Sequence, residues 1–314
     1  FRSMLFRSEP LRKLVTELPG YEALQDNVQP RSARAFLTER LREPLLVDML
    51  LCPILFYGGA QPDDMDLVRF GILFRSVFVE GLGRPGKGIR PLLMMLRDRY
   101  LACDGALRLG SGVARILIRE GRVAGVELDG GEVIHAPVVF SSAGLVETRA
   151  LCEPALPEIG PVPAGEMAFV ESIFVLDTQP RSLGEEHSIV FFSTQDELAY
   201  RPPEALVDDR SGLLCLPDNF AGESSEHEQG TVRLSRLASP RRWGGLDPVA
   251  YQQAKAVALA EQQDSLCHWL PGVRPHVTMT DFFTPRTVER FTGHRNGAIY
   301  GSPVKIPSGS LPAK

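Results

Sequence analysis

The glycine-rich stretch at residues 81–88, GLGRPGKG, has the spacing that comes nearest to a nucleotide-binding motif. It fits both GxGxxG, a dinucleotide fingerprint, and GxxxxGK, the start of a phosphate loop. A phosphate loop needs Ser or Thr after the Lys, and Gly88 stands there. Pro85 removes an N–H group that a dinucleotide loop would offer to a pyrophosphate, and residues 70–80 before the loop are typical of a helix rather than a strand. These conflicts argue against a nucleotide role.

Other catalytic patterns are absent from the sequence. Ser141-Ser142 lacks the flanking glycines of a GxSxG nucleophile elbow, and the acidic pair Asp63-Asp64 is better explained as the cap of a helix over residues 65–79. The five cysteines include no CxxC pair and the six histidines include no HExxH, so we expect no metal site. Widely spaced, odd-numbered cysteines also indicate a reducing compartment.

The elements that must position any site are clearest at residues 104–144. Apolar clusters of strand length occur at 106–109, 113–120, 123–128, 133–135 and 138–142. Gly121-Arg122 and Asp129-Gly130-Gly131 supply the turn residues between them. The sequence therefore predicts a β-meander that feeds a final buried strand ending at Gly144.

This stretch resembles the second segment of the flavin-binding domain in phytoene-desaturase-like FAD oxidoreductases, relatives of the flavin amine oxidases. The order and spacing of four short segments carry the resemblance: 105–106, 113–116, 121–130 and 139–143. Two C-terminal stretches, TPRTVERFTG at 284–293 and NGAIYGSP at 296–303, are similar to the end of that family's substrate domain.

The resemblance implies a mixed α/β fold: part of an FAD-binding domain with a β-meander, joined to a substrate domain of sheet and helices. It places Val113 beside the adenine through backbone groups. It also brings Ser142, Ala143 and Gly144 close to the cofactor, where a larger side chain would collide. The family opens with a GxGxxG loop between strand and helix, and nothing before Arg31 matches it. We therefore expect this chain by itself to bind FAD weakly or not at all.

The predicted substrate pocket combines residues from distant parts of the chain. The resemblance matches residues 81–88 to a glycine-rich turn that passes close to flavin and substrate, which selects Gly86 and Gly88. Phe74 belongs to an apolar helical stripe, which indicates core packing or, alternatively, the lining of a tunnel for a long apolar ligand. Phe283 and Tyr300 complete the candidates.

A flavin explains why catalytic side chains are lacking, because the isoalloxazine supplies the redox chemistry and the protein supplies position and a dry pocket. The expected activity is that of an FAD-dependent desaturase, isomerase or saturase acting on a long apolar, isoprenoid-like substrate. Two alternatives stay open: a flavin amine oxidase, and a non-catalytic protein that binds an apolar ligand without a cofactor.

The expected domain organisation has four segments. Residues 1–103 form the helical part of the substrate domain and 104–150 the FAD-binding segment. Residues 151–285 form the sheet and a long helix of the substrate domain, in which Asp247-Pro248 starts the helix as cap and first residue. Residues 286–314 return toward the FAD-binding domain.

Composition limits the partners. A net charge of −5 with mixed signs provides no basic surface for nucleic acid. The longest apolar run, 45–57, is interrupted by Asp48 and Pro53 and is too short to span a bilayer, so we expect a cytoplasmic protein. Peripheral membrane contact, which a lipid-like substrate would favour, and the oligomeric state stay open.

Overall fold

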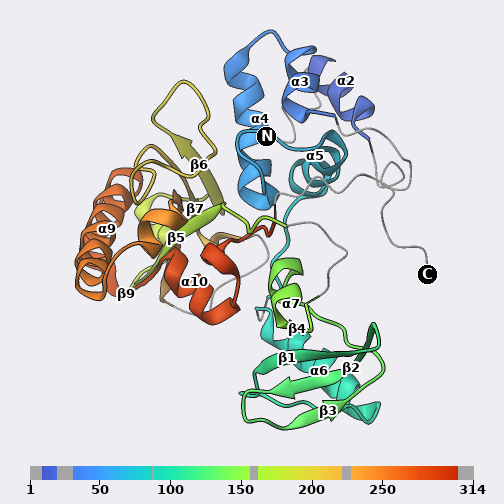
Figure 1. The fold of residues 1–314 in the computed structure, drawn as a ribbon. Coiled ribbons are helices and arrows are strands. Elements are labelled where there is room, and N and C mark those ends of the chain that lie inside the picture. Colours follow the sequence, from blue (N-terminus) through green and yellow to red (C-terminus); the bar gives the residue numbers. More distant parts are fainter. Residues whose placement is uncertain (1–8, 20–30, 87, 156–161, 221–227, 303–314) are drawn as a thin grey trace.

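The computed structural model describes residues 9–19, 31–86, 88–155, 162–220 and 228–302. These residues form three groups (Figure 1). A helical group lies at one end, a large sheet carries a long helix on one face, and a small sheet lies apart from both at the other end. The mixed α/β fold class predicted above is confirmed.

The helical group buries an apolar core. Its members are α2 (Glu9–Glu17), α3 (Ala33–Thr38), α4 (Pro44–Gly58), α5 (Leu67–Phe74) and the π-helix η2 (Arg75–Glu80). Ser32 caps α3 by accepting a hydrogen bond from the Ala35 N–H, and Asp66 caps α5. The predicted cap at Asp63-Asp64 is therefore wrong by two residues, because Asp64 instead accepts a 2.5 Å hydrogen bond from the Ser32 hydroxyl and links the two helix starts.

The large sheet is antiparallel, with strand order β6-β7-β8-β5-β9. Its strands are β5 (Ala168–Leu176), β6 (Ile189–Ser193), β7 (Ser211–Cys215), β8 (Gly230–Ala238) and β9 (Val277–Phe283). The long helix α9 (Pro248–Trp269) covers one face, where Phe174, Val232 and Leu266 are buried together. Asp247 caps α9 and Pro248 is its first residue, as the sequence predicts.

Short elements connect and follow these strands. They are η3 (Pro180–Leu183), η4 (Pro217–Asn219), α8 (Pro240–Gly244), η5 (Arg274–His276), α10 (Pro285–Thr292) and η6 (Arg295–Gly297). Thr284 begins α10 with a capping box, in which its hydroxyl and that of Thr287 reciprocally bond each other's backbone N–H groups. Among the described residues, no helix has the length and apolar content needed to cross a membrane.

The small sheet has strand order β3-β2-β1-β4. Its strands are β1 (Val113–Arg119), β2 (Arg122–Leu128), β3 (Val133–His135) and β4 (Cys152–Glu153), and it is accompanied by α6 (Arg90–Ala102) and α7 (Leu145–Leu151). Gly121 and Gly131 adopt positive φ of 74° and 83° in the two hairpin turns. The predicted meander is thus present from 113 to 135.

Two predicted strands of this region, 106–109 and 138–142, belong to neither sheet. A strand needs a neighbour for its backbone N–H and C=O groups, and none of the described residues pairs with either segment. Their apolar side chains face solvent: Leu109 is 82% exposed and Phe140 97% exposed. No residue of α6 is buried either, although it carries Leu93, Met95 and other apolar side chains.

Candidate functional site

The residues predicted to lie beside the cofactor all belong to the small-sheet group. Val113 is the first residue of β1, 38% exposed, and is followed by an irregularity in the pairing of β1 with β2. Ser142, Ala143 and Gly144 form an extended segment that leads into α7, and α7 packs against β1. Within the described part of the chain, the N–H groups of Ser142 and Gly144 have no hydrogen-bond partner.

Gly144 occupies a position that disfavours a side chain. Its φ is 102°, a conformation that L-residues rarely adopt, and a Cβ there would lie 2.5 Å from Glu147 Oε2. The same carboxylate accepts a 2.9 Å hydrogen bond from the Arg295 N–H, and His294 Nδ1 lies 3.8 Å from its Oε1. This junction, which sequence reasoning missed, joins the start of α7 to the C-terminal segment. Nothing in the local sequence around Gly144 indicates that its partner lies near residue 295.

The face of the large sheet turned away from α9, here called the distal face, carries a continuous row of side chains across all five strands. Register places Phe191, Leu213, Ser235, Glu171 and Phe283 opposite one another in turn. At the centre of the row, Glu171 accepts hydrogen bonds from Arg233 at 2.6 Å and Ser235 at 3.0 Å. The remaining members of the row are apolar. The row is therefore an apolar surface with one ion pair, Glu171–Arg233, at its centre.

An aromatic cluster joins the distal face to α4. Phe56 of α4 stacks on Phe169 of β5 with ring centroids 5.5 Å apart and meets Phe191 edge-on at 6.1 Å. Tyr300 meets the Phe169 ring edge-on and its hydroxyl donates to the Phe56 carbonyl. Two predicted pocket residues therefore lie at the distal face: Phe283 through its register with Glu171, and Tyr300 through its contact with Phe169. No direct contact joins the two side chains among the described interactions.

Burial keeps the tyrosines of this region protonated. It raises the pKa of Tyr57 to about 12, and it also raises the pKa values of Tyr200 and Tyr300. The Tyr200 hydroxyl donates a 2.8 Å hydrogen bond to the Gly59 carbonyl. The hydroxyls of Tyr200 and Tyr300 act as hydrogen-bond donors, and at neutral pH none of the three tyrosines serves as a base.

The other predicted pocket residues lie elsewhere. Phe74 is fully buried in the core of the helical group, to which Tyr300 also packs at the edge. Gly86 and Gly88 lie in the segment between η2 and α6, where Gly86 is exposed and Gly88 half-buried. Lys87, which completes the GxxxxGK pattern, lies outside the described residues. The core interpretation of the Phe74 stripe is the one that its burial favours.

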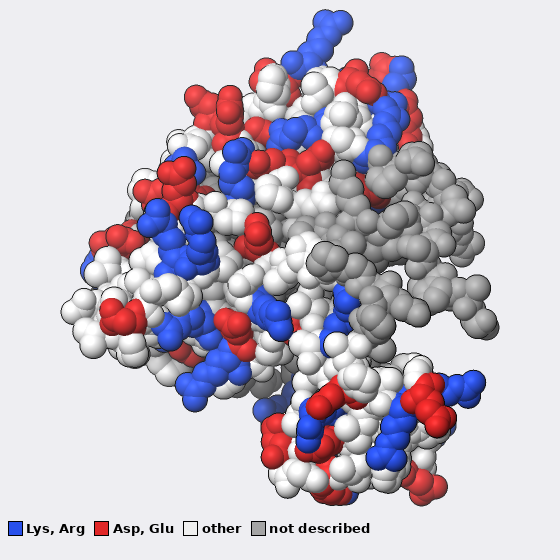
Figure 2. Space-filling model, viewed as in Figure 1, with Lys and Arg blue, Asp and Glu red and all other residues white. Residues whose placement is uncertain are grey.

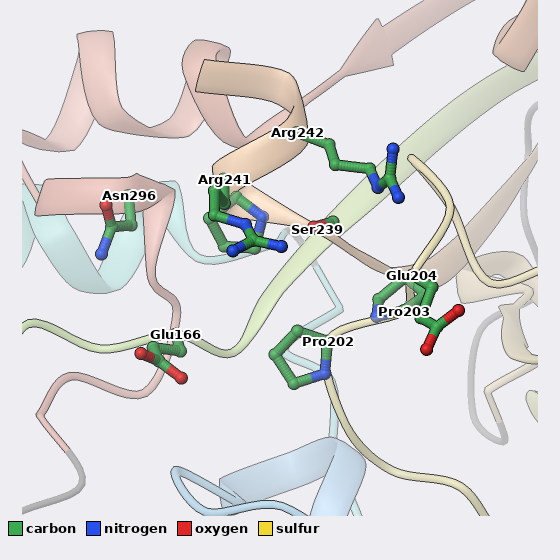
Figure 3. Close-up of a pocket in the computed structure, with 9 residues that line it drawn as sticks. Glu166, Pro202, Pro203, Glu204, Ser239, Arg241, Arg242 and Asn296 are labelled. Carbon is green, nitrogen blue, oxygen red and sulfur yellow. The ribbon is translucent and has the colours of Figure 1, made fainter. Parts of the chain in front are cut away.

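A pocket of about 730 Å³ lies at one end of the large sheet (Figure 3). It is lined by side chains from four separate segments: Glu166, Pro202, Pro203, Glu204, Ser239, Pro240, Arg241, Arg242 and Asn296. Arg241 and Arg242 form no ion pair with another described residue. The pocket mixes charges of both signs, so it suits a polar ligand better than a hydrocarbon. Sequence reasoning missed it because its residues are far apart in the chain.

Figure 2 shows acidic and basic side chains interspersed over the visible face, without an extended basic surface. Within the described ranges, no three His, Cys, Asp or Glu side chains are grouped so that they could hold a metal ion. The chain thus presents backbone N–H groups in the segment 142–144, next to the small sheet, and apolar side chains on the distal face of the large sheet.

No family model matches the chain, but a search of known proteins finds several with weak sequence similarity to it. Prolycopene isomerase 2 of an Oncidium hybrid cultivar, a chloroplastic protein, is 21% identical over 300 residues, covering 90% of this chain and 48% of that protein. The phytoene desaturase of Neurospora crassa is 28% identical over 154 residues, covering 47% of this chain and 24% of that protein. The chain thus spans about half the length of the prolycopene isomerases it matches.

Solved structures share the fold. An oxidoreductase from Methanosarcina mazei superposes with a TM-score of 0.58 at 15% identity, covering 88% of this chain and 61% of that one. A double mutant of putrescine oxidase superposes with a TM-score of 0.57 at 14% identity, covering 94% of this chain and 62% of that one. The predicted resemblance to phytoene desaturases is confirmed as weak sequence similarity, and the fold is one that oxidoreductases and amine oxidases share.

Proposed function

We propose that the protein to which this chain belongs is an FAD-dependent oxidoreductase of the desaturase, isomerase or saturase type, acting on a long apolar, isoprenoid-like substrate. The observation that carries the proposal is the sequence similarity to prolycopene isomerases over 90% of the chain. The match to a phytoene desaturase supports the same class of substrate. Because the chain spans only 48% of the isomerases, the proposal concerns the longer protein.

The residues of the small sheet fit one edge of an FAD site. The backbone of Gly144 disfavours a side chain, and the N–H groups of Ser142 and Gly144, which have no partner among the described residues, are suited to anionic or carbonyl oxygens of a ligand. Val113 presents strand backbone at the start of β1. The same group of elements also exposes apolar side chains on α6 and at Phe140, as expected of a surface against which other chain segments pack. When bound, the flavin would supply the electron transfer that these side chains lack.

The distal face fits the substrate side. Phe283 provides apolar contact area, Phe191 and Leu213 add the surface that their packing against the helical core leaves exposed, and the Glu171–Arg233 pair satisfies its own charges. Such a surface offers a polyene few groups that would lose hydration on binding, so burial of the ligand is favoured. Of the pocket residues predicted from the sequence, we keep Phe283 and Tyr300 as candidates for contact with the substrate. Their role would be to position an apolar chain and to exclude water.

The proposal is tested on the longer protein that contains this chain. Its visible absorption spectrum gives the flavin content, and chromatography after incubation with prolycopene or phytoene gives the conversion. Putrescine serves as the amine control, with peroxide formation as its readout. Flavin with polyene conversion supports the proposal. Flavin with amine oxidation would replace it by an amine oxidase, and a protein without flavin that still binds polyenes would replace it by a ligand-binding protein.

The matched variants lie on the distal face. Phe283→Ala should raise the KM for a polyene and leave the flavin content unchanged, because the side chain is removed from the substrate side alone. Met279→Ala is the control: the side chain lies on the same strand and is 59% exposed, but it does not belong to the row that crosses the sheet. Equal effects of the two substitutions would contradict the assignment of Phe283.

A further inference from the structure

A layer of polar side chains lies inside the apolar interface between the large sheet and α9. It consists of Ser172 on β5, Arg236 on β8, and Gln262 and Ser265 on α9. Ser172 is 0% exposed, Gln262 1% and Arg236 7%. Burying such groups is unfavourable unless each finds a partner, so their presence here requires a cause.

Strand register brings the sheet residues together. Ser172 lies opposite Leu234, and Arg236 lies opposite Val170, so Ser172 and Arg236 are diagonal neighbours on the face that α9 covers. Gln262 and Ser265 are three residues apart on α9 and share a side of that helix. Arg236 Nη2 donates a 2.5 Å hydrogen bond to Ser265 Oγ, which fixes the guanidinium against the helix.

Most of the hydrogen-bonding capacity of this layer is unused by the described residues. Ser172 Oγ, Arg236 Nε and both amide atoms of Gln262 are buried without a hydrogen-bond partner. The layer separates two apolar clusters, one containing Phe174 and Leu266 and the other containing Val170 and Ala258.

Arg236 also lacks an adjacent counter-charge. It forms no ion pair with any described carboxylate, and its nearest aromatic contact is the Phe192 ring at 5.5 Å. Burial lowers its pKa, against the longer-range influence of Asp208, Asp209 and Glu261. Asp208 is already engaged by Arg210 and the Ser211 hydroxyl. An arginine stays protonated in proteins. A positive charge therefore remains buried in this polar layer, beside donors that have no partner.

We propose that this polar layer binds a small monovalent anion, with chloride as the physiological occupant, through Arg236 Nε–H, the Ser172 hydroxyl and the Gln262 amide N–H. An anion bound in this layer would compensate the guanidinium charge and accept hydrogen bonds from the donors that lack a partner, with Gln262 Oε1 turned away from it. A water molecule is the alternative occupant. It would satisfy the hydrogen bonds but would leave the charge of Arg236 uncompensated, so the charge favours the anion.

The test is thermal unfolding of the full chain in sodium chloride, sodium bromide and sodium gluconate at equal ionic strength. Gluconate is too large for a buried site of this kind. An anion that binds only the folded state stabilises it by mass action, so chloride and bromide should raise Tm saturably above the gluconate value. Crystals grown with bromide should show an anomalous peak within hydrogen-bond distance of Arg236 Nε.

Two variants keep Arg236 and remove other donors. Ser172→Ala and Gln262→Met should fold, because they replace unpartnered polar groups by apolar ones, and each should reduce the halide-specific rise in Tm. Arg233→Gln is the matched control: it removes an arginine from the same strand, but on the distal face, where it pairs with Glu171. It should retain the full halide effect. Equal Tm in chloride and gluconate, or electron density for water without an anomalous bromide peak, would overturn the proposal.

Discussion

Substitution of Gly144 by Ala should destabilise the junction between α7 and the C-terminal segment by about 2–4 kcal/mol. The backbone at φ 102° and ψ 157° lies in a region that is open essentially to glycine alone, which costs a non-glycine residue about 1–3 kcal/mol. The new Cβ would also lie 2.5 Å from Glu147 Oε2. Rotation of Glu147 relieves that contact but breaks its 2.9 Å hydrogen bond from the Arg295 N–H, at a further cost of about 1 kcal/mol.

The assay is urea unfolding followed by circular dichroism, together with hydrogen exchange of the α7 amides as a local readout. Gly130→Ala is the matched control in the same group, because its Cβ would meet nothing within 4 Å and its φ is not in the positive range. Introducing Gly144→Ala into a Glu147→Ala background should cost about 1 kcal/mol less than in the parent chain. A Gly144→Ala variant within about 0.5 kcal/mol of the parent, with unchanged α7 exchange, would refute the reasoning.

Three further predictions follow from the same structure. Tyr200→Phe removes the 2.8 Å hydrogen bond to the buried Gly59 carbonyl and should lower stability by about 1–2 kcal/mol, measured by urea unfolding; an unchanged midpoint would contradict the bond. Burial raises the pKa of Cys52 from 9.0 to about 12 and that of Tyr57 from 10.0 to about 12, so the stability that their neutral forms provide is complete below pH 9 and lost as pH rises toward 12. Unfolding free energies across this range, with the 295 nm absorbance of tyrosinate, check the sign. The purified 314-residue chain should retain little or no FAD after gel filtration, and stoichiometric yellow flavin would contradict that expectation.

Local signals in the sequence located the start of the long helix and the turns of the small-sheet meander. Asp247-Pro248 is a helix start that depends only on a side-chain acceptor and a fixed φ, and α9 begins there. Asp129-Gly130-Gly131 is a hairpin turn for an equally local reason, and β2 and β3 are joined there. Such features are predictable because neighbouring residues decide them.

The start of α5 shows where local reasoning fails. Asp63, Asp64 and Asp66 are three acidic residues within one turn, and each is chemically able to cap a helix. Ser32 and the Arg34 N–H engage Asp64, which leaves Asp66 as the cap. The choice depends on a segment about thirty residues earlier in the chain, and no local pattern contains that information.

The sequence by itself determined the start of α9, the turns of the meander and the resemblance to phytoene desaturases, because these depend on residue type and short-range spacing. Only the tertiary structure decided which residues meet. Strand register put Phe191 and Phe283 at opposite ends of one row on the distal face and placed Ser172 beside Arg236 under α9. It also left residues 138–142 without a strand partner among the described residues, because pairing needs a second backbone at hydrogen-bonding distance, whatever the propensity of the first.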